Sequence, residues 1–228
     1  MTHISVIIPA YNCQAYLQEA IESVLSQKMA DLEIIVIDDG STDGTAFIAA
    51  SYAPFVICVS QKNMGIGAAR NRGVNLAQGK FFAFLDADDL WTENKLSRQL
   101  ALFKADPHID ALFGHAVQFI SQEISENPYL ISTEPVPAHL PGTLLIRREN
   151  FFKVGLFCTE HLLGEGVEWY GRLLQSGLNI VLSKEIFLKR RVHNNNSVTR
   201  HKSSYRDYVW HLKRLLDKKR GKERADLL

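Results

Sequence analysis

Apolar runs alternate with amphipathic stretches along the first half of the chain. Four runs rich in β-branched or aromatic residues predict buried strands, at residues 4–8, 32–37, 56–59 and 81–85. Between them, apolar residues return at the spacing of one helix face, which predicts helices at residues 17–25, 45–49 and 66–77. This alternation is typical of an α/β fold whose sheet is mainly parallel and covered by helices on both faces.

The pattern is weaker in the second half of the chain. Residues 121–142 contain four prolines and little periodicity, so they predict a long loop that can act as a lid over a site. We expect one domain over residues 1–199, followed by a basic amphipathic helix at residues 200–228. Apolar spacing predicts further helices and strands, at residues 93–106, 111–113, 168–175 and 186–192.

Polar residues follow the predicted strands where each one ends. The fourth strand runs directly into Asp86, Asp88 and Asp89, and residues 10–12 and 38–43 follow the first two strands. Because the carboxyl ends of parallel strands meet at one edge of a sheet, we expect these groups to lie together where ligands bind. Hard divalent cations take carboxylate oxygens together with the phosphates of a substrate. The sequence therefore predicts a Mg²⁺ or Mn²⁺ site shared with a phosphorylated ligand, while Asp89 also fits a helix cap.

Composition narrows the range of protein classes. The chain has 228 residues, 46% of them hydrophobic, which suits one domain with a substantial core. No apolar run is long enough to span a membrane, and no cleavable leader precedes the first strand. Cys13, Cys58 and Cys158 are odd in number and widely spaced, as in proteins with reduced thiols. These features predict a cytoplasmic protein.

Charge is distributed unevenly along the chain. Residues 1–199 carry 16 Lys and Arg against 21 Asp and Glu, whereas residues 200–228 carry 10 against 4. The basic helix expected there is either a solvated face or a peripheral contact with the inner membrane surface, since basic residues beside an apolar stripe attract anionic lipid. Basic residues interleaved with aromatic ones are lacking, so we expect no nucleic-acid partner.

Five short motifs occur in order along the chain. They are Val-Ile-Ile-Pro-Ala-Tyr-Asn at residues 6–12, Asp-Asp-Gly-Ser-Thr-Asp at 38–43, Asn-Met-Gly-Ile-Gly-Ala-Ala-Arg-Asn at 63–71, Leu-Asp-Ala-Asp-Asp at 85–89 and Arg-Val-His at 191–193. Together they resemble glycosyltransferase family 2, whose members have the GT-A fold. The resemblance implies a Rossmann-like sheet and transfer of a sugar, with inversion, from a nucleotide diphosphate donor such as a UDP-sugar. The acceptor stays open between a saccharide, a lipid-linked and a peptide hydroxyl, and a homodimer is allowed.

The resemblance assigns roles to the residues that end the first two strands. Pro9, Ala10 and Tyr11 would border the base and the ribose of the donor. Asp38 would accept a hydrogen bond from a pyrimidine N–H, and this match discriminates because a wrong base leaves a buried polar group unpaired. In the alternative interpretation, Asp38 serves only to form a turn.

The Asp-Ala-Asp sequence matches the DXD element of the family. Asp86 and Ala87 would lie near the ribose or the sugar, and the metal would be held by Asp88, with Asp86 as the second ligand. The cation would neutralise charge on the departing nucleoside diphosphate. The basic residues at 190–193 match a late strand that approaches the diphosphate, where His193 is either a metal ligand or a structural residue.

The segment from Asn63 to Arg70 opens the third predicted helix and is a second candidate for phosphate binding. Gly65 allows close backbone approach, and the free N–H groups of a helix start favour negative charge. The segment is not a dinucleotide fingerprint, because Arg70 stands where a third glycine is required. Arg70 either faces the diphosphate or forms an ion pair with a nearby carboxylate.

The expected catalytic base departs from the family pattern. Inverting members carry Glu-Asp before a helix and use the second acid as base, whereas this chain has Glu165 followed by Gly166. We expect Glu165 or Glu168 to replace the missing acid, because a base need only lie within hydrogen-bond reach of the acceptor hydroxyl. Alternatively both glutamates are surface residues, and the protein binds nucleotide sugars without transferring them.

Overall fold

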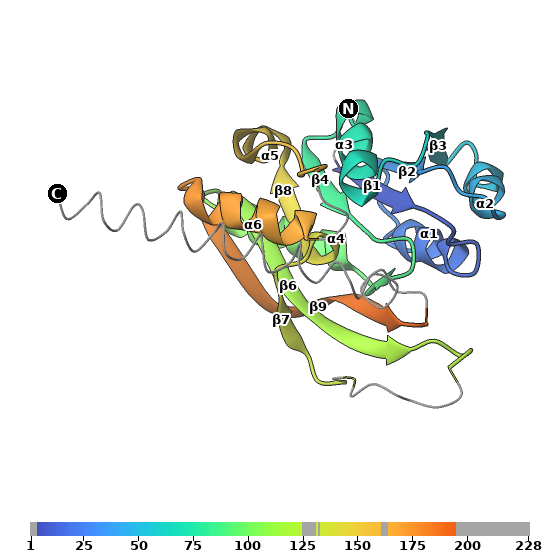
Figure 1. Cartoon of the computed structure of the whole chain (residues 1–228). Helices are drawn as coiled ribbons and strands as arrows, with labels where there is room; N and C mark the ends of the chain where they lie inside the picture. Colours follow the sequence, from blue (N-terminus) through green and yellow to red (C-terminus); the bar gives the residue numbers. More distant parts are fainter. Residues whose placement is uncertain (1–3, 125–130, 132, 161–163, 195–228) are drawn as a thin grey trace.

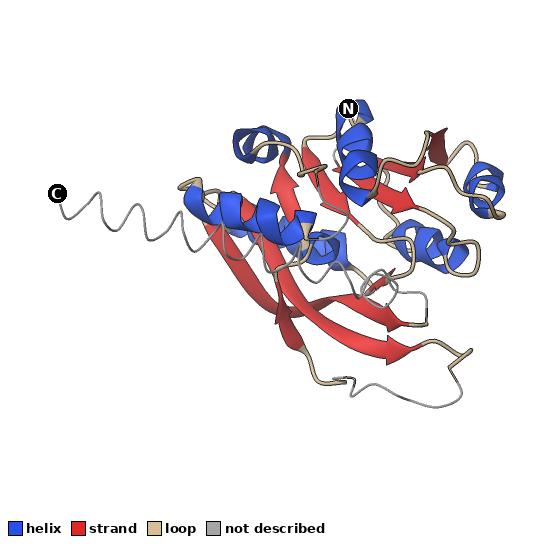
Figure 2. Cartoon of the chain, in the orientation of Figure 1, coloured by secondary structure: helices blue, strands red, loops and turns tan. Residues whose placement is uncertain are grey.

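The computed structural model describes residues 4–124, 131, 133–160 and 164–194 (Figure 1). They form a single α/β domain around one curved sheet, in which the strand order is β3-β2-β1-β4-β8-β6-β9-β5 and β7 pairs with β6. Parallel pairing predominates, and helices lie on both faces of the sheet (Figure 2). The predicted fold class is therefore confirmed.

The first four strands are parallel and build the half of the sheet that carries the polar strand ends. They are β1 (Ile4–Ala10), β2 (Leu32–Asp38), β3 (Val56–Ser60) and β4 (Phe81–Phe84). The helices of this half are α1 (Leu17–Leu25), α2 (Thr45–Ser51) and α3 (Ile66–Leu76). Each matches a predicted element within a few residues, because apolar runs bounded by turn residues leave little ambiguity.

Side chains of β1 alternate between two apolar layers. Ile4, Val6 and Ile8 pack in the layer that contains α1, whereas Ile7 packs in the layer that contains α3. Gly73 lets α3 approach the sheet closely, since a Cβ atom at this position would lie 2.4 Å from Cγ2 of Ile7. The two helices thus cover opposite faces of the strand that ends at the predicted site.

The second half of the chain adds the remaining strands to the same sheet, through both antiparallel and parallel pairings. Strand β8 (Leu145–Arg147) is antiparallel to both β4 and β6 (Ala111–Ile120) and so joins the two halves. Strand β9 (Ile180–Val192) is parallel to β6, and the two strands form the long arm of the sheet in Figure 1. The remaining elements are β5 (Leu90–Trp91), α4 (Lys95–Ala105), β7 (Val136–Ala138), the 3₁₀ turn η1 (Pro141–Thr143), α5 (Arg148–Val154) and α6 (Glu165–Gln175).

Several boundaries predicted for this half are wrong. Residues 90–91 form β5 and not the approach to a helix, while β6, β9 and α6 each extend beyond the predicted spans. The pattern misses β8 and α5, because a strand of three residues and a helix of two turns are too short to show a period. Residues 121–142 are not a continuous loop, since β7 and the start of η1 lie within them, and the part at 125–130 and 132 lies outside the described residues.

The remaining expectations concern the C-terminal residues 200–228, membrane-spanning segments and the cysteines. The basic helix predicted at 200–228, and with it the domain boundary at 199, lies outside the described residues. Over the part of the chain that the structure describes, no helix has the length and apolar character needed to cross a membrane. The three cysteines form no disulfide.

Helix α4 buries the side chain of a lysine. Lys95 is fully buried, its Nζ donates a hydrogen bond to Oε1 of Gln99 at 2.8 Å, and it lies 4.1 Å from the ring centroid of Trp91. Burial lowers the pKa of Lys95 well below its ordinary value, because the charged form is poorly solvated there.

Candidate functional site

The carboxyl ends of the parallel strands meet at one edge of the sheet. The register pairs Ala10 with Asp38, and β4 continues the sheet on the other side of β1. The structure therefore brings the polar strings at residues 9–11, 38–43 and 86–89 to the same edge, as the sequence pattern requires.

Side chains tie the loop after β1 to the loop after β2. Ser41 Oγ accepts the N–H of Asn12 at 3.0 Å, and Asn12 Oδ1 accepts the N–H of Thr42 at 2.8 Å. Tyr11 lies at the start of this cross-linked region and is 43% exposed. A partly exposed aromatic residue thus lies at the strand-end edge, where such a ring can stack on a planar ligand.

The two aspartates at the end of β2 are both buried but have different partners. Asp38 Oδ1 accepts the N–H of Ser41 at 3.1 Å, which is a turn contact. Asp39 accepts three hydrogen bonds, one from the side chain of Gln61 at 2.7 Å and two from backbone N–H groups at residues 64–65, at 3.0 and 2.8 Å. Sequence reasoning overlooked Asp39, whose only signal is its place as the second acid at a strand end.

Asp39 fixes the segment that opens α3. Gly40 has φ of +76°, and a Cβ atom there would lie 2.8 Å from the backbone nitrogen of Asn63, so glycine allows the segment to pass close by. Gly65, with φ of +87°, is the N-cap of α3. Asn63 and Gly65 consequently lie beside the end of β2, but the N–H groups of Met64 and Gly65 donate to Asp39 and are not the free donors that the sequence predicts for a phosphate.

Arg70, which is buried, forms an ion triad with two of the predicted site residues, of which Asp86 is partly exposed. Its Nη2 lies 2.5 Å from Oδ1 of Asp86, and its Nη1 lies 2.5 Å from Oε1 of Glu165. Burial opposes the charge, but the two carboxylates outweigh it and raise the pKa of Arg70 above its ordinary value. The ion-pair interpretation of Arg70 is therefore confirmed. Both of its Nη groups are paired with carboxylates of the protein.

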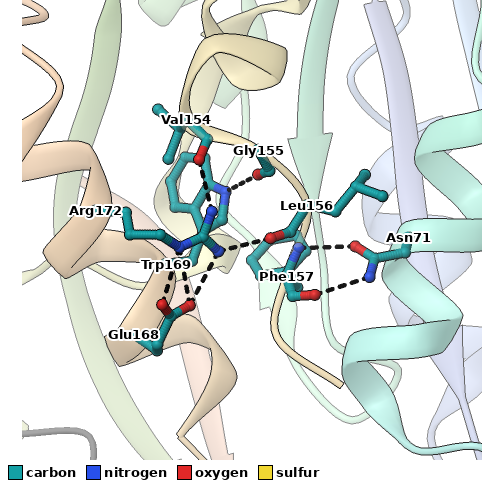
Figure 3. A network of polar contacts seen from close by, with 8 residues as sticks. All are labelled: Asn71, Val154, Gly155, Leu156, Phe157, Glu168, Trp169 and Arg172. Carbon is teal, nitrogen blue, oxygen red and sulfur yellow. Dashed lines mark hydrogen bonds and ion pairs between the residues drawn. The ribbon is translucent and has the colours of Figure 1, made fainter. Parts of the chain in front are cut away.

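A second ion pair lies within α6, and its arginine also binds the segment at residues 154–157, as Figure 3 shows. Arg172 Nε donates to both oxygens of Glu168 at 2.9 and 3.0 Å, and its Nη groups donate to two carbonyls of the segment at 2.6 Å. Trp169 donates to a third carbonyl at 2.8 Å, and Asn71 of α3 bonds the last residue of the segment. Glu165 and Glu168 are thus buried and ion-paired, and the surface interpretation is wrong.

Gly166 leaves space at the position where the resemblance predicts the catalytic base. A Cβ atom built at this position would meet only Cδ and Cγ of Pro141, both at 3.4 Å, which is ordinary van der Waals contact. The position lies between the two ion-paired glutamates, in the first turn of α6. A Cβ atom could therefore be accommodated here without moving the backbone.

The acids after β4 are engaged by the end of β9. Asp88 Oδ2 lies 2.9 Å from Nε2 of His193, and Asp89 Oδ1 accepts the N–H of Arg191 at 2.8 Å. Burial, followed by the charges of Asp88 and Asp86, raises the pKa of Asp89 well above its ordinary value. The helix-cap interpretation of Asp89 is wrong, because the residue binds strand β9 and is followed by strand β5.

Two residues of the α1 region support this contact, and the sequence analysis did not identify them. Arg191 donates from Nε to the carbonyl of Asp88 and from Nη2 to Glu19, both at 2.9 Å. Its guanidinium lies 5.0 Å from the ring of Tyr16, and that ring lies 4.5 Å from the ring of His193. The orientation of Asp88 and His193 therefore depends on side chains from α1, β4 and β9 together.

The donor set at this edge is compatible with a shared metal. Among the described residues no group of three or more His, Cys, Asp or Glu side chains gathers to hold an ion. Asp88 and His193 nonetheless offer an oxygen and a nitrogen donor 2.9 Å apart. A cation bound by such a pair would complete its coordination with substrate phosphates and water, as Mg²⁺ commonly does.

Comparison with known proteins places this geometry in a family. A family model described as "Glycosyl transferase family 2" matches residues 5–159. An uncharacterized glycosyltransferase of Rickettsia typhi is 32% identical over 205 residues, which cover 84% of this chain and 64% of the relative. The chain therefore spans slightly less than two thirds of the length of this relative.

Solved structures share the fold at lower sequence identity. Staphylococcus aureus TarS 1–349 in complex with UDP-GlcNAc matches with a TM-score of 0.74 and 20% identity, over 93% of this chain and 65% of the TarS chain. The mannosyltransferase PcManGT from Pyrobaculum calidifontis, in complex with GDP-Man and Mn²⁺, matches with a TM-score of 0.64 and 19% identity, over 85% of this chain and 58% of its own.

Proposed function

The chain belongs to glycosyl transferase family 2, and from this premise we propose that it transfers a sugar from a nucleotide diphosphate donor to an acceptor hydroxyl, with inversion and with a divalent cation. The contact between Asp88 and His193 carries the proposal, because it presents two metal-binding groups at the edge where β1, β2 and β4 end. Such an edge is where α/β sheets bind nucleotides.

A UDP-sugar is the proposed donor. The likeness to TarS in complex with UDP-GlcNAc favours it, whereas the likeness to PcManGT in complex with GDP-Man keeps a guanosine donor as the alternative. Pro9, Ala10 and Tyr11 would border the base and the ribose. Asp38 would accept the N–H of a pyrimidine with Oδ2, since Oδ1 already accepts a backbone N–H.

The diphosphate would lie between the metal and the start of α3. Asp88 and His193 would hold Mg²⁺ or Mn²⁺, with Asp86 as a further ligand only through the oxygen that its guanidinium partner does not use. When bound, the ion would neutralise charge on the departing nucleoside diphosphate. Ala87 would lie on the ribose or sugar side. Asn63 would approach the phosphates, whereas the N–H groups of Met64 and Gly65 already donate to Asp39.

Glu165 is the better placed of the two candidate bases. It shares the guanidinium of Arg70 with Asp86 and so lies beside the donor edge, whereas Glu168 is bonded to Arg172. A carboxylate in this ion pair would accept the acceptor's proton only by exchanging its contact with Arg70. Gly166 favours the alternative function, nucleotide-sugar binding without transfer, because it puts no carboxylate at the family's base position.

Titration of the protein with UDP in the presence of Mn²⁺ tests the metal assignment. We expect Asp88→Asn to weaken UDP binding about 10- to 100-fold, as the loss of a metal ligand or its support commonly does. Asp31→Asn, which removes the same charge at an exposed position, should bind UDP like the wild type. Unchanged affinity in Asp88→Asn would contradict the metal assignment.

Turnover separates the two functions. UDP-sugars are incubated with the wild-type protein, Mn²⁺ and a panel of acceptors, and the release of UDP is followed. Release that depends on an acceptor supports transfer, and binding without release across the panel supports the alternative.

A further inference from the structure

An open cavity lies against the part of the sheet where β6 pairs with β7 on one side and with β9 on the other. Its volume is about 190 Å³. Ala116 and residues 136–140 form walls that are mostly apolar, and Gln118 and Arg190 add polar groups. Mainly apolar walls with a few polar groups are typical of sites for small ligands.

Arg190 brings a positive charge into this cavity without a protein partner. The side chain is half-buried, and within the described part of the chain it forms no hydrogen bond or ion pair, although its charge acts on nearby Asp89. The adjacent Arg191, in contrast, is bonded to Glu19 and to a backbone carbonyl. A guanidinium is always charged and presents five N–H donors, so Arg190 is ready to bind an anion.

An aromatic pair lies at the side of the cavity that faces α6. The ring of His139 stacks on Tyr170 with centroids 4.6 Å apart, and Phe113 meets both rings edge-on. Burial lowers the pKa of His139, so the imidazole is neutral near pH 7 and adds hydrogen-bonding capacity without a second charge. The charge of the cavity therefore comes mainly from Arg190.

The cavity lies between the proposed metal edge and the start of α6. At one end, Arg190 precedes Arg191, whose backbone and side chain bind Asp89 and Asp88. At the other end, the wall continues into Pro141, the residue that approaches Gly166. A sugar in the cavity would therefore lie with one end toward Arg190 and the metal edge and the other end toward the start of α6.

We propose that this cavity binds the acceptor of the transfer reaction and that Arg190 recognises an anionic group on it, a carboxylate or a phosphate. The inference rests on the proposed function, because it assigns the cavity to the second substrate of the same site. Both anions accept two parallel hydrogen bonds from a guanidinium, so the geometry favours them over a neutral sugar. The apolar walls would contact the ring of the saccharide.

Binding of matched probes tests the proposal independently of turnover. The probes are 4-nitrophenyl β-D-glucuronide, 4-nitrophenyl β-D-glucoside, in which a hydroxymethyl group replaces the carboxylate, glucose 6-phosphate and glucose. Calorimetry with the full chain, in the presence of UDP and Mn²⁺, should show at least one anionic probe binding about tenfold more tightly than its neutral counterpart, a difference of about 1.4 kcal/mol. Preference for the glucuronide identifies a uronate acceptor, and preference for glucose 6-phosphate a phosphorylated one.

Two variants locate the binding group. Arg190→Gln should abolish the preference for the anion while leaving UDP affinity and the thermal melting temperature unchanged. Lys189→Gln removes a positive charge from the neighbouring, exposed position of β9 and should keep the preference. The proposal is overturned by equal binding of anionic and neutral probes, by a preference that survives Arg190→Gln, or by a loss of UDP affinity in that variant, which would assign Arg190 to the diphosphate.

The same measurements distinguish this proposal from the proposed function. A protein that fails to bind UDP or any nucleotide sugar, yet shows an Arg190-dependent preference for an anionic probe, supports the anion site and contradicts nucleotide-sugar transfer. A protein that binds UDP with Mn²⁺ but shows no such preference contradicts the anion site alone.

Discussion

The two sides of the site hold their acidic groups by different means. At the end of β2, Asp38 and Asp39 accept hydrogen bonds from backbone N–H groups of the loops that follow. In the first turn of α6, Glu165 and Glu168 are held by guanidinium groups of Arg70 and Arg172. A backbone N–H is positioned by the main chain, whereas an ion pair within the protein depends on two side chains that must both be present.

The difference separates ligand binding from proton transfer. On the β2 side, the acids accept hydrogen bonds that order the loops around the strand ends. On the α6 side, each acid is neutralised by an arginine, so neither is free to accept a proton without losing its partner. We infer that the β2 side is arranged for ligand binding. On the α6 side, the ion pairs stabilise the fold and limit the availability of a catalytic base.

Placing an acid on the α6 side that is not ion-paired should remove this limitation. Gly166→Asp adds a carboxylate where a Cβ atom meets only Pro141 at 3.4 Å, so we expect the helix to tolerate it. If proton transfer limits the rate, acceptor-dependent turnover should rise about 10²- to 10⁴-fold, the usual worth of a general base. Gly166→Asn has the same shape without a base, and an equal rise in that variant would rule out proton transfer as the cause.

Removing the shared guanidinium should strongly destabilise the protein. Arg70→Met leaves Asp86 and Glu165 without their partner, and we expect the free energy of unfolding to fall by about 3 to 5 kcal/mol. Urea denaturation measures the change, and Arg72→Met, at an exposed position of the same helix, should change stability little. A loss below about 1 kcal/mol in Arg70→Met, in the range of a surface pair, would contradict the importance of the triad.

Removing an acid on the β2 side should have a smaller and more local effect. Asp39→Ala deletes the acceptor for Gln61 and for two backbone N–H groups, and we expect a loss of about 2 kcal/mol. Hydrogen exchange should show faster exchange of the amides of Met64 and Gly65, because these groups lose their acceptor. Unchanged protection of both amides would mean that another contact orders the segment.

The smallest effect concerns Lys95, whose amino group contacts the side-chain amide of Gln99 and the ring of Trp91 and not a carboxylate. Its pKa in the folded protein lies well below the ordinary value of 10.5, so between these two values the unfolded chain binds a proton that the folded chain does not. Stability should therefore rise with pH in this window, by up to about 1.4 kcal/mol per pH unit.

Lys95→Met removes this titration. The free energy of unfolding of the variant minus that of the wild type should be larger at about pH 9 than at about pH 10. The reason is that only the wild type gains stability over that interval. Urea denaturation at both values measures the difference. A difference between the two proteins that does not change with pH would show that Lys95 keeps its proton in the folded state.

The first half of the fold could be predicted because its signals are local. Each apolar run of β1 to β4 is followed directly by polar or turn residues, and parallel strands bring those ends to one edge. The second half was predicted less well, since β8 is held by pairing with β4 and β6 and not by a pattern of its own. The missed contribution of Asp39 has the same origin, because its partners lie 22 to 26 residues away.

By itself, the sequence determined which residues end the strands, where Asp86 and Asp88 follow β4, and that glycine occupies position 166. Only the tertiary structure decided that Arg70 binds Asp86 and Glu165, that Asp88 meets a histidine 105 residues away, and that a cavity opens beside Arg190. The physical reason is that strand and helix signals come from neighbours along the chain, whereas ion pairs and cavities depend on distances that exist only after the sheet has assembled.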